Sequence, residues 1–291
     1  MNPIVLHFAD GTTFFVGLAL VLVAEILLSR FHTSVIRPVL TVLVLVGAIL
    51  VALSATPLPI WMYAVWGIPA LAGLVLGNRS ESSLRSRCVA FAVLLVTTVG
   101  LCLAELPYHW TPHLVVKSDA AIYVLGDSIS AGMGTKERCW PTVLAETTRL
   151  RVVNLAQPGA TVKSAAMQAK SITESNTVVI VEIGGNDLLG RTDAAAFRDQ
   201  LDSLVSSLRS AQHQVLIVEL PLFPFQNAFG QAQRSSAAKY GAAMLPKRTF
   251  AKVLGTRNGT LDGLHLSQDG HNAMAKSIAE VIKMNPQSPL E

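Results

Sequence analysis

Four apolar stretches before residue 106 constrain this 291-residue chain more than any other feature. They run from about Thr12 to Leu28, Pro38 to Leu53, Pro59 to Leu76 and Cys88 to Ala104. Each approaches the roughly 20 residues that a helix needs to cross a bilayer. The mean hydropathy of +0.46, with only 14% charged residues, is too apolar for an ordinary soluble enzyme. We therefore expect a helical transmembrane domain over residues 1–115, made of four spans and a linker.

The arginines of this first half indicate how the spans are oriented. They fall in the first and third connections between the apolar stretches, as Arg30, Arg37, Arg79, Arg85 and Arg87, with Glu81 as the one acid beside them. The N-terminal tail and the second connection carry no Lys or Arg. Cytoplasmic loops are enriched in Lys and Arg, so both arginine-bearing connections are expected inside. Everything after the fourth span is then expected outside the cytoplasm, in the periplasm or facing the cell exterior.

Three residues within the spans are unusual for a membrane segment. Glu25 lies near the predicted cytoplasmic end of the first span, and we expect its side chain to extend toward Arg30 or Arg37. Gly73 and Gly77 form a G-x-x-x-G pattern in the third span. This pattern predicts close helix packing within the four-helix group, with dimerisation as the alternative.

The second half alternates short apolar runs with longer amphipathic ones. The expected strands are Ile122–Leu125, Arg151–Leu155, Val178–Ile183 and Val215–Leu220. The expected helices are Trp140–Thr148, Val162–Ser171, Ala194–Ala211 and Gln268–Lys283, the last with Ser267 as its cap. Such alternation predicts a three-layer α/β/α domain with a doubly wound parallel sheet over residues 116–291. The irregular segment from Pro221 to Arg248 is expected to form a loop and helix over the active cleft.

Several classes of partner are not indicated. Lysines and arginines of the second half are scattered among acids and form no basic stripe, so no nucleic acid is expected. The three cysteines, Cys88, Cys102 and Cys139, have neither disulfide nor zinc spacing. The segment Glu105–His113 is interpreted as an interfacial belt leading into a linker, although two histidines leave a metal site open. We expect neither a cofactor nor a metal.

The stretch from Ala120 to Gly134 is the candidate centre of the chemistry. It reads as a buried strand that stops at Ser128, and ligands of open α/β sheets bind beyond the carboxyl ends of the strands. Residues that could serve as base, orienting acid and oxyanion donors fall later at strand ends or loops: His265, Asp262, Gly159 and Asn186.

Other residues near these motifs have simpler interpretations. Ser130 is a rival nucleophile, but we expect it to cap a helix. His271 falls within the last predicted helix and is expected on the surface. Asp127 and Asp187 are expected to brace turns through backbone hydrogen bonds.

The motifs Gly126-Asp127-Ser128, Gly159, Gly185-Asn186-Asp187 and Asp262-Gly-Leu-His265 occur in the order found in one family. From Ala120 to Lys283 the chain resembles the SGNH, or GDSL-type, hydrolases, and within them the thioesterase, lysophospholipase and arylesterase branch. The resemblance implies a flavodoxin-like sheet with Ser128 as nucleophile, His265 as base and Asp262 as its orienting acid. It also implies an oxyanion hole formed by the backbone N–H groups of Ser128 and Gly159 and the side-chain amide of Asn186.

Together these observations predict a multi-pass, membrane-anchored serine esterase that works outside the cytoplasm. It would hydrolyse carboxylic or thio esters of a small molecule, lipid or glycan through an acyl-enzyme on Ser128. The alternative is an O-acyltransferase that passes the same acyl group to an envelope glycan. A hydrolase-like domain that only binds is the third hypothesis, although every triad residue is in place.

Overall fold

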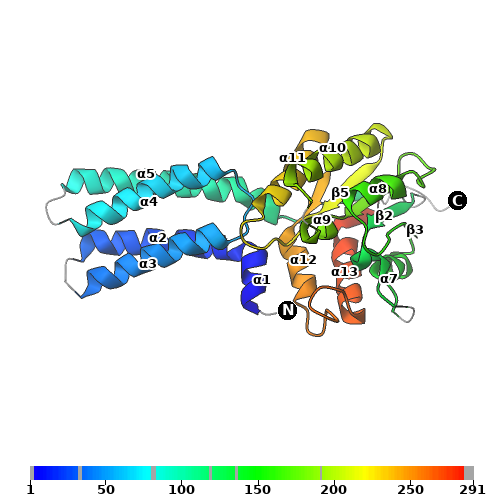
Figure 1. Cartoon of the computed structure of the whole chain (residues 1–291), viewed down its shortest axis with the longest axis horizontal. Helices are drawn as coiled ribbons and strands as arrows, with labels where there is room; N and C mark the ends of the chain where they lie inside the picture. The colour runs from blue at the N-terminus through cyan, green and yellow to red at the C-terminus, as the bar shows by residue number, and fades with distance from the viewer. Residues whose placement is uncertain are drawn as a thin grey trace. The chain divides into compact units, whose positions relative to one another are not determined.

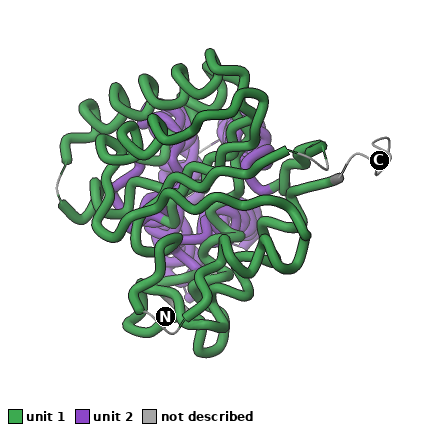
Figure 2. The backbone as a smooth tube through the Cα atoms, turned by 90° about the vertical axis from the view of Figure 1, so that its right-hand side faces the viewer, with its two compact units in different colours: residues 1–6, 110–221, 228–291 green, residues 7–109, 222–227 purple. Residues whose placement is uncertain are grey.

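A computed structural model describes residues 3–31, 35–79, 83–117, 120–134, 137–190 and 192–284. The chain divides into two compact units, which Figure 2 shows in different colours. One unit comprises residues 7–109 and 222–227 and is called the helical unit here. The other comprises residues 1–6, 110–221 and 228–291 and is called the sheet unit. Each is described by itself.

The helical unit is built from long apolar helices. After the short α1 (Pro3–Ala9), these are α2 (Thr12–Arg30), α3 (Ile36–Leu53), α4 (Ile60–Asn78) and α5 (Leu84–Glu105), which continues as the 3-10 turn η1 (Leu106–His109). Within the described residues, these four long helices have the length and hydropathy needed to cross a membrane. They confirm the four predicted apolar helices and extend beyond most of the predicted ends, where polar residues complete the outer turns.

The core of the helical unit is centred on α2. Phe14, Leu18 and Val21 of this helix are almost fully buried against residues of the other helices, including Val44 and Leu94. Large apolar side chains also cover the outward faces of the bundle, as at Val39, Ile68 and Val96. A helix that is apolar on every side suits a lipid environment, because no face then places polar groups in hydrocarbon.

Glycines let α2 and α3 approach closely. A Cβ atom built on Gly47 would lie 2.9 Å from the carbonyl oxygen of Gly17 and 2.7 Å from Cγ2 of Val21. A Cβ atom on Gly17 would lie only 2.6 Å from the carbonyl oxygen of Gly47. Small residues at such crossings allow backbone-to-backbone packing in place of side-chain packing.

Glu25 does not extend toward the arginines, so that prediction is wrong. Its side chain is 5% exposed and lies against Gly73 of α4, where a Cβ atom would be 2.0 Å from the Glu25 Oε2. Among the described residues, its Oε1 has no hydrogen-bond partner. The missing side chain of Gly73 creates the space that the carboxyl fills, and Gly77 packs on Leu28 one turn later. The G-x-x-x-G pattern thus serves close packing within the unit, as predicted.

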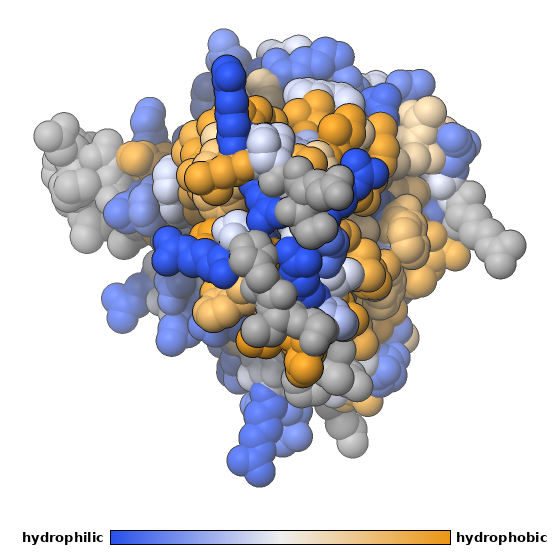
Figure 3. Space-filling view, turned by 90° about the vertical axis from the view of Figure 1, so that its left-hand side faces the viewer, coloured by the Kyte–Doolittle hydropathy of each residue, from blue (hydrophilic) through white to orange (hydrophobic). Residues whose placement is uncertain are grey.

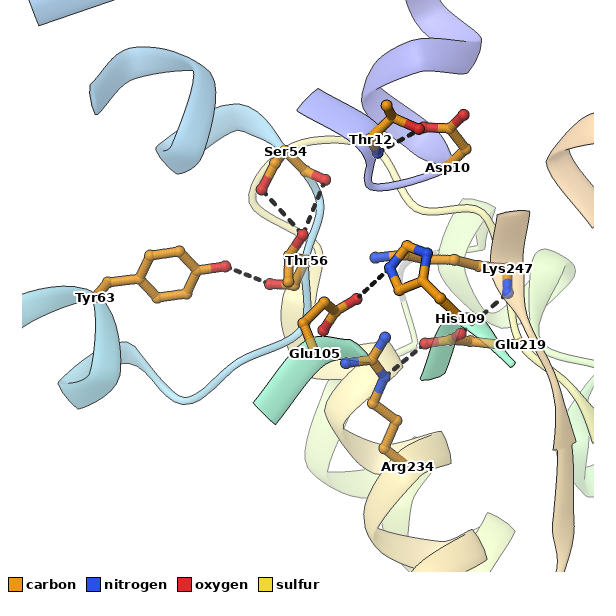
Figure 4. Close-up of polar contacts among 10 residues, drawn as sticks. All are labelled: Asp10, Thr12, Ser54, Thr56, Tyr63, Glu105, His109, Glu219, Arg234 and Lys247. Atoms are coloured by element: carbon orange, nitrogen blue, oxygen red, sulfur yellow. Dashed lines mark hydrogen bonds and ion pairs between the residues drawn. The ribbon is translucent and has the colours of Figure 1, made fainter. Parts of the chain in front are cut away.

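The two ends of the bundle carry different polar groups. Figure 3 views the end with the α2–α3 and α4–α5 connections, where hydrophilic side chains project among apolar ones. Arg30, Arg79 and Arg85 are exposed there, whereas Glu81 lies outside the described residues. The α3–α4 connection is uncharged and holds itself together by local hydrogen bonds. Figure 4 shows the Tyr63 hydroxyl donating to the backbone carbonyl of Thr56 over 2.5 Å.

The sheet unit contains, within the described residues, a five-stranded sheet in which every pairing is parallel. Its strands are β2 (Ile122–Gly126), β3 (Val152–Asn154), β4 (Val178–Glu182), β5 (Gln214–Val218) and β6 (Ala243–Leu245), in the order β3-β2-β4-β5-β6. This is a flavodoxin-like order, and it confirms the predicted doubly wound sheet. Sequence reasoning missed β6 and the separate parallel pair of β1 (Leu114–Val116) and β7 (Ile282–Met284).

Helices cover both faces of this sheet (Figure 1). One face carries α7 (Trp140–Thr148), α12 (Lys247–Leu254) and α13 (Gln268–Val281); the other carries α8 (Val162–Ala169), α10 (Ala194–Ser210) and α11 (Asn227–Tyr240). The strands β2 and β4 are buried along their whole length, as a central parallel strand between two helical layers must be. Ser267 caps α13 by accepting from the N–H of Gly270, which confirms that prediction.

The segment Pro221–Arg248 was expected to be a flap, but most of it completes the sheet unit. It contains α11 and β6, and the buried carboxylate of Glu219 holds α11 and the start of α12 to the end of β5. Arg234 Nε donates to Glu219 Oε1 over 2.6 Å, and the backbone N–H of Lys247 donates to Oε2 over 3.0 Å (Figure 4). All three residues are almost fully buried. The sequence did not predict this role in the core, because long polar side chains such as those of Arg234 and Lys247 are usually on the surface.

The close approach of α2 and α3 leads to a prediction on stability. Gly47→Ala places a methyl group against Val21 and the Gly17 carbonyl, so the free energy of unfolding should fall by about 1–3 kcal/mol. Gly100→Ala is the matched control, because nothing lies within 4 Å of its Cβ position. In that open helical position, alanine should be neutral or stabilise by up to about 1 kcal/mol. Thermal unfolding of the full chain in detergent, followed by circular dichroism, measures both, and equal melting temperatures would contradict the proposed contact.

Candidate active site

Ser128 occupies the turn where β2 gives way to the short helix α6 (Ser128–Ala131). It is half-buried, and the Asp127 before it caps the helix, with Oδ1 accepting from the N–H of Ile129 over 2.9 Å. In the sheet, β3 lies on one side of β2 and β4 lies on the other. Ser128 therefore lies at the point where the strand order reverses, which is where ligands of doubly wound sheets bind.

Asp262 and His265 form a hydrogen-bonded pair. His265 Nδ1 lies 2.6 Å from Asp262 Oδ2, while Asp262 Oδ1 accepts the backbone N–H groups of Leu264 and His265. These hydrogen bonds, that of the His265 side chain first, hold the pKa of Asp262 below its usual range. An ionised Asp262 can only accept, so Nδ1 of His265 carries the proton and Nε2 keeps its lone pair. The pair thus leaves Nε2 free to act as a base.

The charge of His265 acts on Asp127, which directly precedes the candidate nucleophile Ser128. Burial is the main cause that raises the pKa of Asp127 to about 6, and the charge of His265 counteracts it.

Asn186 and Gly159 meet beside the same turn. Asn186, in the short helix α9 (Gly185–Leu189), directs its Nδ2 to Asp127 Oδ2 over 3.2 Å and to the carbonyl of Ala160 over 3.0 Å. Gly159 adopts a φ of 76°, a left-handed conformation that favours glycine. The bond to Ala160 links this glycine turn to Asn186, and the bond to Asp127 links both to Ser128. The predicted oxyanion donors therefore belong to one connected cluster.

Two predictions about neighbouring residues are wrong. Ser130 caps no helix: it is fully buried within α6, and Asp127 provides the cap instead. His271 is not on the surface but 1% exposed, and its Nδ1 accepts the backbone N–H of Trp140 over 3.2 Å. Both errors arose because α7 packs over these positions, which local sequence patterns do not reveal. Asp187 does brace a turn, since its Oδ2 accepts the N–H of Val162 over 2.9 Å.

Sequence reasoning also missed two buried side chains that hold the turn after β2. Gln168 of α8 clamps Gly126, with its Oε1 accepting the Gly126 N–H and its Nε2 donating to the Gly126 carbonyl, each over 3.0 Å. Glu182, the last residue of β4, accepts from the Ser130 hydroxyl over 2.8 Å. The one available signal was a carboxylic acid closing the apolar run Val178–Val181.

The comparisons with known proteins point to one family. The model of the GDSL-like Lipase/Acylhydrolase family matches residues 124–273, more than half of the chain. The chain belongs to this family. The matched range contains all five predicted site residues, and the family assignment confirms the resemblance seen in the sequence. As a member, the chain is a serine hydrolase that acts on ester bonds.

Relatives in the GDSL-like family support this assignment. Esterase TesA of Pseudomonas aeruginosa is 30% identical over 177 residues, which cover 56% of this chain and 87% of that protein. Thioesterase 1/protease 1/lysophospholipase L1 of Escherichia coli is 23% identical over 191 residues, covering 62% and 92%. The crystal structure of the esterase EstA from Pseudoalteromonas sp., inhibited by monoethylphosphonate, shares the fold with a TM-score of 0.50 and 18% identity, covering 56% and 96%.

The buried His271 gives a prediction on pH. Burial lowers its pKa from the ordinary 6.5, so the unfolded chain binds this proton at a higher pH than the folded one. The stability contributed by the neutral imidazole is present above pH 6.5 and is lost as the pH falls. Between about pH 7.5 and about 5.5, the melting temperature of the wild type should therefore fall more steeply than that of His271→Gln. The exposed His113→Gln serves as control, and equal slopes for all three proteins would refute the prediction.

Proposed function

We propose that the chain is a membrane-anchored esterase that works outside the cytoplasm, through an acyl-enzyme on Ser128. The observation that supports the assignment of the site is the hydrogen bond between Asp262 and His265. A serine hydroxyl is a weak nucleophile unless an oriented base takes its proton. The pair supplies that base together with the acid that orients it.

The proposed reaction has two halves. Ser128 Oγ attacks the ester carbonyl carbon while His265 Nε2 takes the hydroxyl proton, and Asp262 stabilises the resulting imidazolium. The tetrahedral intermediate collapses to the acyl-enzyme, and the imidazolium gives its proton to the departing alcohol or thiol. Water then attacks the acyl-enzyme, with His265 taking a water proton and returning it to Ser128 as the carboxylic acid leaves.

The oxyanion of each tetrahedral intermediate would be held by the N–H groups of Ser128 and Gly159 and by Asn186 Nδ2. In the resting structure Nδ2 contacts Asp127 Oδ2 and the Ala160 carbonyl. These two bonds keep the amide at the edge of the site, and one N–H turns to the developing negative charge. An oxyanion donor acts mainly in the transition state, where the negative charge develops.

An acyl ester with an apolar chain is the substrate class that we favour. Leu261 directly precedes Asp262, and Leu264 directly precedes His265. Leu189 lies three residues after Asn186 in α9, and all three leucine side chains are exposed. Exposed apolar residues beside candidate catalytic groups suit an acyl chain better than a sugar. The related Escherichia coli protein is named a thioesterase and lysophospholipase. Transfer of the acyl group to a sugar in preference to water would instead favour the acyltransferase alternative.

Substitutions of Ser128 and Asn186 test the proposed roles. If Asn186 donates to the oxyanion, Asn186→Ala should lower kcat about 10²- to 10³-fold with little change in KM. Ser128→Ala should lose far more activity and should no longer react with a fluorophosphonate probe. Steady-state hydrolysis of p-nitrophenyl esters of increasing chain length, by the full chain in detergent, provides both constants.

A structural role for Asn186 predicts a different result for the same variants. Asn186→Ala would then have a lower melting temperature and a near-normal kcat in the molecules that remain folded. That outcome would remove Asn186 from the site, whereas labelling of Ser128→Ala by the probe would refute the assignment of the nucleophile.

The proposed orientation rests on the exposed arginines at the end of the bundle that carries the α2–α3 and α4–α5 connections. With that end in the cytoplasm, the segment after α5 is outside. Alkaline phosphatase, which is active only outside the cytoplasm, should therefore be active when fused after Glu291. Green fluorescent protein fused at the same place should not fluoresce when it is exported in an unfolded state. Bright fluorescence with an inactive phosphatase would reverse the orientation and the choice of substrates with it.

A further inference from the structure

The carboxyl of Glu182 lies behind the nucleophile turn. Glu182 is the last residue of β4, 2% exposed, and pairs with Gly126 in the parallel ladder between β2 and β4. Gly126 stands two residues before Ser128. The carboxyl thus originates from the strand next to the one that carries the candidate nucleophile.

The turn is tied to β4 on both sides of Ser128. The Ser130 hydroxyl donates to Glu182 Oε2 over 2.8 Å, and Gly126 pairs with Glu182 in the ladder. Holding both Gly126 and Ser130 fixes where the residues between them can lie, because the backbone of one helical turn has few soft dihedral angles.

A third side chain extends the network to the helical layer. Trp140 Nε1 of α7 donates to the Ser130 hydroxyl over 3.1 Å, so that hydroxyl accepts from the indole and donates to Glu182. Gly126 leaves the necessary room, since a Cβ atom there would be 2.7 Å from Ser130 Oγ. Trp140, Ser130 and Glu182 are all almost fully buried. Buried networks in which every member has a partner hold their geometry well.

The environment of Glu182 suits an uncharged acceptor. Burial, reinforced by the charge of Asp127, raises its pKa well above the usual range. The hydrogen bond that Glu182 accepts comes from a neutral hydroxyl. A side-chain amide of the same length could therefore accept the same bond.

We propose that Glu182 is a positioning residue for ester hydrolysis, which sets the place of Ser128 by holding the Ser130 hydroxyl. This inference rests on the proposed role of Ser128 as nucleophile. Glu182 acts through the turn and makes no contact with the ester. Residues of this kind matter because a displacement of about 1 Å at the reacting atom can reduce the rate about 10²-fold.

Two substitutions of Glu182 separate positioning from charge. Glu182→Leu removes both acceptor oxygens and should reduce kcat about 10²-fold with a much smaller effect on KM. Glu182→Gln keeps an acceptor and should retain most of the wild-type kcat. Tyr123→Phe is the control: it removes a buried-strand hydrogen bond from β2, to Glu174 over 3.0 Å, remote from the turn, and should leave kcat unchanged.

A double-mutant cycle tests whether Glu182 acts through Ser130. Ser130→Ala removes the donor and should lower kcat in the same direction as Glu182→Leu. Because both changes break one link, the double variant should lose little more than the worse single variant. Fully multiplicative losses would show that the two residues act independently and would overturn the proposed route.

The rate of labelling by a fluorophosphonate, measured in the full chain, keeps the two proposals distinguishable. Failure of the wild type to label, or labelling of Ser128→Ala, overturns the role of Ser128. Labelling of folded Glu182→Leu at the wild-type rate overturns the role of Glu182 alone. The role of Glu182 is also overturned if the labelling rate of folded Glu182→Gln falls as far as that of Glu182→Leu. If Glu182→Leu does not fold, Ser130→Ala tests the role of Glu182 in its place. A wild-type labelling rate in Ser130→Ala overturns the inference.

Discussion

The geometry of the sheet unit depends on one constraint: the turn after β2 must stay fixed although it ends in polar groups inside the fold. Side chains from four surrounding elements satisfy those groups. Gln168 clamps Gly126, Glu182 accepts from Ser130, Trp140 donates to Ser130, and Asn186 donates to Asp127. Buried polar groups without partners are costly, so each bond both satisfies a group and locates it. The position of Ser128 follows from this set of bonds.

The ends of two adjacent strands show how a buried carboxyl can be accommodated differently. Glu219, directly after β5, is held by the guanidinium of Arg234 and a backbone N–H. Glu182, at the end of β4, is held by the Ser130 hydroxyl. The first arrangement ties α11 and α12 to the sheet through charge, whereas the second secures the nucleophile turn through a neutral donor. A buried glutamate thus holds helices to the sheet at the end of β5, whereas at the end of β4 it positions the nucleophile turn.

The helical unit solves a different problem, because its outer faces are apolar and its contacts cannot rely on polar pairing. Close packing at Gly17 and Gly47 brings α2 and α3 together. Gly73 gives the carboxyl of Glu25 a place between α2 and α4, away from the apolar exterior. The glycines therefore determine the packing of these helices as much as the larger side chains do.

The sequence by itself determined the local features of this protein. Hydropathy defined the four long helices, and alternation of apolar runs defined four of the five strands of the described doubly wound sheet. The order of short motifs indicated the family, because each motif occupies a strand end or loop whose composition is visible locally. The Asp262–His265 pair was also predictable, since its members lie three residues apart.

Only the tertiary structure decided which polar residues are buried and what they contact. Ser130 and His271 are buried beneath α7. Glu25 is buried against Gly73, and Arg234 is buried against Glu219 at the end of β5. The partners of these residues are far away in the sequence, so no periodicity records them. A polar side chain reads as a surface residue until the fold brings a partner to it, because burial is favourable only once that partner is in place.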